Sequence, residues 1–143
     1  MLPTYKISWD QIEKSCDILA NKVLESQWQC SSIVGISRGG SIPATIIAHR
    51  LGINRLYLVA YKQNKDKLKE VYPIHQDLRS KTVLLIDDIA DSGNTLQIVK
   101  KSLEDRNCEV RTLSIHKRED ASYIPDYFLY KIDSLIEYPW ENN

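Results

Sequence analysis

Residues 83–96, VLLIDDIADSGNTL, decide the fold expected for this chain of 143 residues. The apolar run that ends at Ile86 is typical of a strand buried on both faces of a parallel sheet. Leu96, Val99 and Leu103 then recur at the spacing of one helix face. Between strand and helix stands the polar string DDIADSGNT. A buried strand that passes through a polar loop into a helix indicates the repeating unit of an open α/β sheet.

The sequence on either side of this unit alternates strand and helix patterns in the same way. The hydroxyl of Ser8 and the amide of Gln11 predict a capping box at the start of the first helix. We therefore expect an open, mostly parallel α/β sheet flanked by helices, formed by a single domain over residues 1–143. The other predicted strands are residues 32–37, 56–60 and 109–115, and the other predicted helices are residues 8–27 and 42–51.

Two segments of the chain lack a strong pattern. Residues 61–76 are polar and rich in lysine, which predicts a mobile loop. Residues 121–143 contain only short aromatic-rich pieces, so we expect a small C-terminal cap rather than a second domain.

Composition and charge narrow the possible classes of function. Nineteen basic and nineteen acidic side chains cancel, so any phosphate site must be local, and nucleic acid is not an expected partner. The longest apolar runs are far shorter than the ~20 residues of a membrane-spanning helix, so no transmembrane segment is expected. Three cysteines without a CxxC pair, and an N-terminus without an apolar signal core, indicate a cytoplasmic protein.

Residues with recognisable ligand chemistry follow three of the predicted strands. They are SRGG at residues 37–40, DDIADSGNT at residues 87–95 and HKR at residues 116–118. In open α/β sheets, ligands bind outside the carboxyl ends of the strands. The sequence therefore predicts one composite site at this edge of the sheet.

The string DDIADSGNT combines two kinds of ligand chemistry. Residues 92–95, SGNT, are small or hydroxylated and leave backbone N–H groups uncovered at a helix start, which favours a bound phosphate. Asp87 and Asp88 would repel that phosphate, so we expect them to face ribose hydroxyls or a Mg²⁺ ion. The structural alternative is that Asp91 or Ser92 simply caps the helix and the two carboxylates are solvated.

The same string resembles the phosphoribosyl diphosphate signature of the type I phosphoribosyltransferases. The rest of the chain is similar to the xanthine-guanine branch of that family. The similar segments are YKISWDQI at residues 5–12, GISRGGSIPATIIAHRLGI at residues 35–53, Lys117 after the strand predicted at residues 109–115, and IEYPWE at residues 136–141. The resemblance implies a purine salvage transferase that joins a 6-oxopurine base to phosphoribosyl diphosphate, uses Mg²⁺, and forms a homodimer or homotetramer.

The resemblance also implies roles for the residues of the predicted site. Asp91 is implied as the catalytic base that takes or shares the purine N7 proton, and Asp88 as the residue that holds the metal ion. Residues 91–95 are implied to bind the 5-phosphate, and the SRGG turn the pyrophosphate. The residues implied to bind phosphoribosyl diphosphate are Ser37, Arg38, Gly39, Asp87, Asp88, Asp91, Ser92, Gly93, Asn94 and Thr95.

Recognition of the purine is implied for Asp91, Lys117, Leu135 and Ile136. The ammonium of Lys117 would donate to a 6-carbonyl and is mismatched to the amino group of adenine. Leu135 stands where the branch has a stacking tryptophan, which leaves open whether guanine, xanthine or hypoxanthine is preferred. The segment 61–76 would form a hood, whose candidate pyrophosphate contacts are Lys62, Lys65, Lys67 and Lys69.

Three other interpretations of the same residues are open. Gly35, Ser37 and Gly39 match the GxSxG elbow of serine hydrolases, with His116 as a possible base. The pair Asp87-Asp88 could form an acidic pocket of the response-regulator kind, although that pocket follows the first strand of its fold. A regulator that keeps the diphosphate site without catalysis is the third, and the neutral charge disfavours one that binds nucleic acid.

Overall fold

The computed structural model describes residues 2–65 and 67–141. Its main sheet has six strands in the order β4-β3-β2-β5-β6-β7, and every pairing except β3 with β4 is parallel. No helix within the described residues has the length and apolar character needed to cross a membrane. The elements are β1 (Thr4–Lys6), α1 (Trp9–Glu25), β2 (Ser32–Ser37), α2 (Ser41–Leu51), β3 (Leu56–Asn64), β4 (Lys67–Tyr72), β5 (Thr82–Ala90), α3 (Asn94–Glu104), β6 (Glu109–Arg118), β7 (Tyr130–Ile132), β8 (Leu135–Glu137) and a 3-10 turn (Pro139–Glu141).

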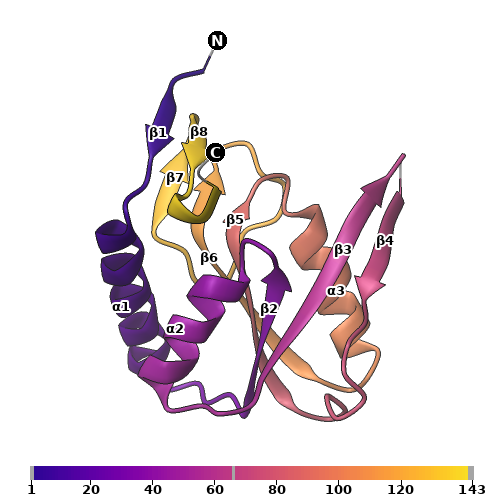
Figure 1. The fold of residues 1–143 in the computed structure, drawn as a ribbon. Helices are drawn as coiled ribbons and strands as arrows, with labels where there is room; N and C mark the ends of the chain where they lie inside the picture. The colour runs from indigo at the N-terminus through magenta and orange to yellow at the C-terminus, as the bar shows by residue number, and fades with distance from the viewer. Residues whose placement is uncertain (1, 66, 142–143) are drawn as a thin grey trace.

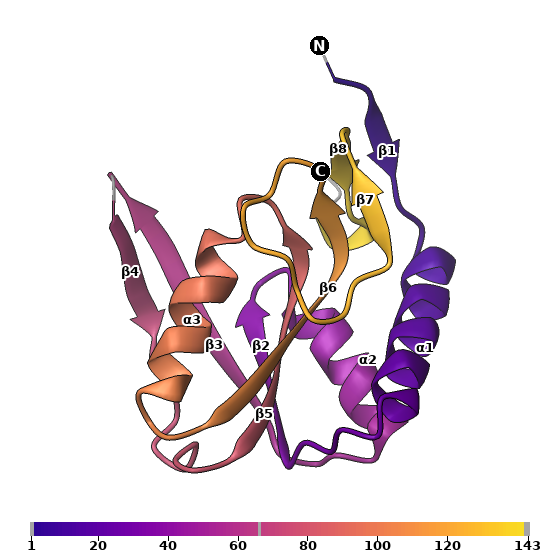
Figure 2. The same ribbon diagram turned by 180° about the vertical axis from the view of Figure 1, so that it is seen from behind.

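The molecule has three layers, with helices on both faces of the main sheet. Helices α1 and α2 lie on one face and α3 lies on the other (Figures 1 and 2). Within β5, Leu84 and Ile86 pack under α1 and α2, whereas Val83 and Leu85 pack under α3. A strand buried on both sides needs apolar residues at every position, which is why its sequence shows no alternation. The expected open, mostly parallel α/β sheet is confirmed.

The ends of the first two helices follow from local sequence. The amide of Gln11 donates to Ser8 Oγ (3.1 Å), and the amide of Ser8 donates to Gln11 Oε1 (2.8 Å), which completes the predicted capping box. Helix α2 ends before Gly52, whose φ of 69° suits glycine because it carries no Cβ. These local signals agree with the tertiary packing of both helices.

Two central strands extend further than their apolar patterns indicate. β5 continues through Asp87 and Asp88 to Ala90, and β6 continues through Lys117 to Arg118. The side chains become polar there, but backbone pairing with the neighbouring strand continues. The expectation that these polar residues follow the strands was therefore wrong. They stand on the strands themselves, which hold them more firmly than a loop would.

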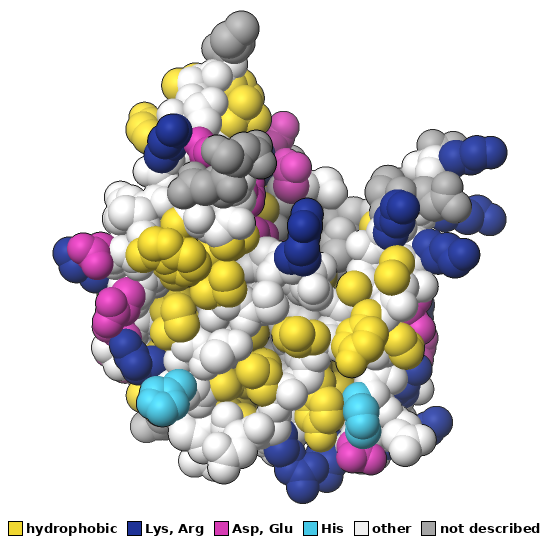
Figure 3. Space-filling model, viewed as in Figure 1, with side chains coloured by type: hydrophobic (Ala, Val, Ile, Leu, Met, Phe, Trp, Pro, Cys, Tyr) yellow, Lys and Arg dark blue, Asp and Glu magenta, His cyan; other side chains and the backbone are white. Residues whose placement is uncertain are grey.

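The polar segment at residues 61–76 forms a hairpin instead of the unpaired loop that was expected. β3 runs to Asn64 and pairs antiparallel with β4 at the edge of the sheet. The side chains of β4 are almost all exposed, so the strand carries no hydrophobic alternation for sequence reasoning to detect. Figure 3 shows dark-blue basic side chains gathered at the tip of this hairpin, in the upper right of the view.

The C-terminal segment joins the fold as well as covering it. β7 pairs with β6 at the second edge of the main sheet, whereas β8 pairs with β1, so the two ends of the chain lie side by side (Figure 1). The aromatic ring of Tyr138 is buried and stacks on that of Trp140, with ring centroids 4.8 Å apart. The expected cap is thus anchored to both sheets through backbone pairing.

Candidate active site

The loop between β5 and α3 forms a cavity of about 210 Å³ that is lined by residues 87–96. Gly93 is the N-cap residue of α3, with a φ of 86°, and as a glycine it has no side chain with which to cap the helix. The hydroxyl of Ser92 accepts a hydrogen bond from the amide of Asn94 (3.1 Å). The amides that follow lie at the positive end of the helix, an arrangement that favours an anion.

A loop from after β6 supports this turn from behind. The amide and the hydroxyl of Ser122 both donate to the carbonyl of Ser92, each at a distance of 3.2 Å. A Cβ atom on Gly93 would clash with the side chain of Tyr123, so the turn needs glycine for space as well as for its φ. The hydroxyl of Tyr123 is itself hydrogen-bonded to Thr112 of β6 (2.8 Å). The turn is therefore held by the main sheet through Tyr123.

Asp87 and Asp88 lie side by side at the mouth of the cavity. Burial and the neighbouring charge of Asp88 raise the pKa of Asp87 well above its usual range, and burial raises the pKa of Asp88. Each carboxylate accepts the amide of the next residue, from Asp88 N to Asp87 Oδ1 (2.8 Å) and from Ile89 N to Asp88 Oδ1 (2.7 Å). Asp88 is not a solvated strand-end charge, because it is only 9% exposed, and Asp87 is partly buried.

A second cavity, of about 900 Å³, adjoins the first through Asp88. The SRGG turn after β2 contributes Arg38 and Gly39 to its lining, and the peptide between Ser37 and Arg38 is cis. Any side chain at Gly39 would clash with the carboxylate of Asp88, so the turn approaches β5 closely. Trp140 and Glu141 of the C-terminal turn line the same cavity. The structure thus brings the first two predicted motifs together across Asp88.

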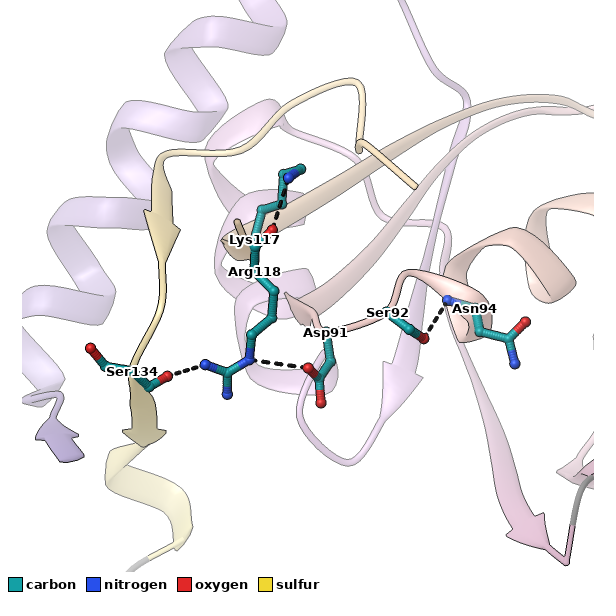
Figure 4. A network of polar contacts seen from close by, with 6 residues as sticks. All are labelled: Asp91, Ser92, Asn94, Lys117, Arg118 and Ser134. Atoms are coloured by element: carbon teal, nitrogen blue, oxygen red, sulfur yellow. Dashed lines mark hydrogen bonds and ion pairs between the residues drawn. The ribbon is translucent and has the colours of Figure 1, made fainter. Parts of the chain in front are cut away.

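Asp91 does not cap α3 but forms an ion pair with Arg118. The Nε atom of Arg118 lies 3.0 Å from Asp91 Oδ1, and a second nitrogen of the same guanidinium donates to the carbonyl of Ser134 (Figure 4). This places the segment just before Leu135 close to the loop of Asp91. Sequence reasoning included Arg118 in the HKR motif but gave it no role of its own, because no pattern in that charged run singles it out.

Lys117, at the end of β6, is buried. It is only 4% exposed, and its ammonium donates to the carbonyls of Arg118 (2.8 Å) and Glu119 (3.5 Å). Lys117 and Arg118 extend from the end of β6 in opposite directions (Figure 4), as successive strand residues do. Leu135 is 47% exposed at the start of β8, and Ile136 pairs with Tyr5 of β1.

Tyr138 is a second residue to which sequence reasoning gave no role. Its hydroxyl donates to the backbone carbonyl of Asp88 (3.2 Å) and lies 2.9 Å from Nδ1 of His116. The single proton of the hydroxyl goes to Asp88, so His116 Nδ1 must be the donor to Tyr138. The strand order disfavours His116 as the base of a serine hydrolase, because β5 lies between His116 on β6 and Ser37 on β2.

Comparison with known proteins agrees with this geometry. The family described as "Phosphoribosyl transferase domain" matches residues 8–143. A xanthine-guanine phosphoribosyltransferase of Chromohalobacter salexigens is 29% identical to this chain, and the alignment covers 96% of this chain and 83% of that protein.

Two solved structures share the whole fold. A purine phosphoribosyltransferase of Pyrococcus horikoshii superposes with a TM-score of 0.90 at 30% identity, covering 98% of this chain and 95% of that one. A hypothetical protein of Neisseria gonorrhoeae with bound ppGpp superposes with a TM-score of 0.82 at 26% identity, covering 99% and 91%. The family match spans residues 8–143, and the relatives that cover nearly the whole chain are themselves named phosphoribosyltransferases. The chain therefore belongs to the phosphoribosyltransferase family and is an enzyme of that family.

Proposed function

We propose that the enzyme joins a 6-oxopurine base to phosphoribosyl diphosphate and releases pyrophosphate and a nucleoside 5-monophosphate, a reaction of purine salvage. The observation that carries this proposal is the pair of adjoining cavities that share Asp88. The first contains the start of α3, whose N-cap residue is a glycine, and the second contains Arg38. The names of the relatives in Chromohalobacter salexigens and Pyrococcus horikoshii support a purine as the acceptor.

The two cavities suit the two phosphate groups of such a substrate. The 5-phosphate would bind to the backbone amides and hydroxyls of residues 91–95, where the helix dipole and N–H donors act together. The pyrophosphate would bind in the larger cavity, where the guanidinium of Arg38 and the backbone of Gly39 are available. The ribose would then lie over Asp87 and Asp88, whose carboxylates accept hydrogen bonds from its hydroxyls.

The carboxylate pair also fits a Mg²⁺ ion. Mg²⁺ prefers one or two carboxylates together with phosphate oxygens and retained waters, which a pair of aspartates can satisfy. The raised pKa values of Asp87 and Asp88 reflect buried negative charge that a cation would compensate. Asp88 would hold the ion, with Asp87 beside it. When bound, the ion would neutralise charge on the departing pyrophosphate.

The protein's own task in the reaction is to hold two reactants in line. The bond from the anomeric carbon to pyrophosphate breaks while a purine nitrogen bonds to the same carbon, through a transition state with oxocarbenium character. The purine loses its N7 proton in the reaction, and this proton passes to the carboxylate of Asp91. Arg38 stabilises the charge that develops on the leaving group.

Base selection falls to the residues around the end of β6 and the start of β8. The ammonium of Lys117 would exchange one of its two backbone carbonyls for the 6-carbonyl of the purine. Leu135 would cover the ring with an aliphatic surface, and the backbone of Ile136 would contact the exocyclic group. The lysines of the β3–β4 hairpin, among them Lys62 and Lys69, would contact the pyrophosphate from the other side.

The same proposal extends to the compartment and the assembly of the enzyme. Cys16 and Cys108 are buried free thiols, and Cys30 is a partly buried one, which suits a reducing cytoplasm. Exposed apolar side chains on α1, such as Trp9 and Leu24, suit contact with a second copy in a homodimer or homotetramer. Analytical ultracentrifugation of the purified chain tests the assembly directly.

A second candidate is nucleotide binding without turnover. It is favoured by the Neisseria gonorrhoeae structure, in which a chain of the same fold holds ppGpp. Such a nucleotide combines a purine with phosphate groups. The purine could bind near Lys117 and Leu135 while the phosphate groups bind in the cavity at residues 87–96. Binding without catalysis would make the protein a regulator, and the assay below separates the two functions.

The decisive experiment measures pyrophosphate release from phosphoribosyl diphosphate and Mg²⁺ with guanine, xanthine, hypoxanthine, adenine and orotate in parallel. We expect release with at least one 6-oxopurine and none with adenine or orotate. Asp91→Asn should lower kcat by about 100-fold, since a positioned general base contributes at least that much. Asp105→Asn, at the far end of α3, is the control and should leave kcat unchanged.

Three outcomes would contradict the proposal in different ways. Silence with every base, together with tight nucleotide binding, would support the regulator. Full turnover by Asp91→Asn would remove Asp91 as the catalytic base. Ester hydrolysis that Ser37→Ala abolishes would support the serine hydrolase instead.

A further inference from the structure

We infer that Arg118 is a positioning residue that ties the proposed base, Asp91, to the chain segment that covers the purine. The inference rests on the proposed function, because it assigns a partner to Asp91 and a purpose to the segment before Leu135. Arg118 itself touches no reacting atom in this arrangement. It acts through the orientation of Asp91 and through the place of Ser134.

The geometry of the guanidinium supports this assignment. One nitrogen, Nε, contacts Asp91 Oδ1 at 3.0 Å, and a different nitrogen donates to the carbonyl of Ser134. A guanidinium is planar and rigid, so two contacts at separate nitrogens fix the angle between their partners (Figure 4). A lysine in the same place would offer a single point charge without that angle.

The burial of the three partners differs in a way that suits positioning. The side chain of Arg118 is 16% exposed, whereas that of Asp91 is 78% exposed. Ser134 is buried, and the next residue, Leu135, emerges into solvent. Arg118 thus contacts both the exposed carboxylate of Asp91 and the buried backbone at Ser134. The strand proposed to cover the purine begins at the residue after Ser134.

The contact leaves Asp91 able to accept a proton. Within residues 2–65 and 67–141, the hydrogen bonds of the Asp91 carboxylate involve Oδ1 alone. Oδ2 therefore remains available to a purine N7 while Oδ1 holds the orientation. An ion pair with so exposed a carboxylate adds little to stability, so stability alone is a weak reason for it.

The test is a double-mutant cycle on turnover with the preferred base. Arg118→Gln should lower kcat by about 10–30-fold, because displacement of a catalytic group by a fraction of an ångström is costly. KM for phosphoribosyl diphosphate should stay within about 2-fold, since Ser122 and Tyr123 hold the phosphate turn independently. Arg118→Lys should recover only part of the lost kcat.

The cycle is closed with Asp91→Asn. If Arg118 acts through the carboxylate, adding Arg118→Gln to Asp91→Asn should lower kcat by less than about 3-fold, a non-additive result. Arg106→Gln is the matched control, because Arg106 also donates to a backbone carbonyl, that of Ser102, but on the far end of α3. It should leave kcat and both KM values unchanged.

The possible results separate this inference from the proposed function. An active wild-type enzyme with additive losses in the cycle, or with unchanged kcat in Arg118→Gln, overturns the inference alone. A wild-type enzyme that is silent with every base overturns both. If Arg118→Gln is unfolded at the assay temperature by circular dichroism, the cycle is run with Arg118→Lys, and full activity of that variant overturns the inference.

Discussion

The two sides of the proposed active site are built in different ways. On the proposed phosphate side, residues 91–95 are contiguous, and the turn is formed by its own glycine and hydroxyl groups with support from Ser122. On the base side, Lys117 comes from β6 and Leu135 from β8, and both depend on contacts between segments far apart in the chain. A contiguous turn carries its geometry in a few residues, whereas an assembled surface depends on every segment that meets there.

Leu135, which the resemblance places where the xanthine-guanine branch has a stacking tryptophan, lies on the base side, where an exposed side chain can change without disturbing its support. The phosphate side tolerates less, because Gly39 and Gly93 each lie against a neighbouring side chain. The comparison leads to three predictions, given from the largest expected effect to the smallest.

Gly93→Ala should break the phosphate side while sparing the base side. An alanine at a φ of 86° is strained, and its Cβ would clash with Tyr123, so the turn must shift. We expect the affinity for phosphoribosyl diphosphate to fall by about 100-fold, which corresponds to about 2.7 kcal/mol. Isothermal titration with the diphosphate and Mg²⁺ measures this directly.

Gly52→Ala provides a matched control for this substitution. Gly52 also has a positive φ, of 69°, but apart from its chain neighbours no described residue has an atom within 4 Å of the place of its Cβ. It should cost about 1 kcal/mol of stability and leave the affinity for the diphosphate unchanged. Equal losses of affinity in the two variants would show that backbone strain alone, rather than the phosphate turn, is responsible.

A fall in pH should lower the free energy of unfolding through His116, which precedes Lys117 on β6. Burial, with a smaller contribution from the charge of Arg118, lowers the pKa of His116 from 6.5 to about 4. The unfolded chain therefore binds the proton first, and the stabilisation present above pH 6.5 is lost as the pH falls towards 4. At pH 4 the loss should reach about 2–3 kcal/mol in the free energy of unfolding.

Urea unfolding of wild type and His116→Gln between pH 7 and pH 4 measures this loss. The difference between the two proteins isolates His116 from Asp87 and Asp88, whose raised pKa values act in the opposite direction. His49→Gln, on the exposed surface of α2, is the control and should follow wild type. Parallel curves for wild type and His116→Gln would contradict the prediction.

Leu135→Trp should strengthen purine binding by a small amount. An aromatic ring at this exposed position would stack on the purine, which adds about 0.5–1.5 kcal/mol and lowers KM for the base by about 2–10-fold. KM for phosphoribosyl diphosphate should not change. Leu24→Trp on the exposed surface of α1 is the control, and an equal gain there would mean that the effect is not stacking.

Much of the fold could be predicted from the sequence because its signals are local. The capping box at Ser8 and the buried run that begins β5 depend on neighbouring residues and on burial alone. The hairpin at β3 and β4 could not, because backbone pairing at an exposed edge leaves no pattern in the side chains. Strand pairing is satisfied by the partner strand, and the partner is unknown from sequence.

The same distinction between local signals and long-range contacts applies to the candidate site. The motif at residues 87–95 identified the candidate phosphate turn and the carboxylate pair, since glycine, hydroxyl and acidic residues reveal their chemistry by type and order. Only the tertiary structure linked Arg118 to Asp91 and Tyr138 to His116, because these pairs lie 27 and 22 residues apart in the chain. Their contacts exist only once β5, β6 and the C-terminal segment pack together, and a linear sequence does not encode which distant side chains will meet.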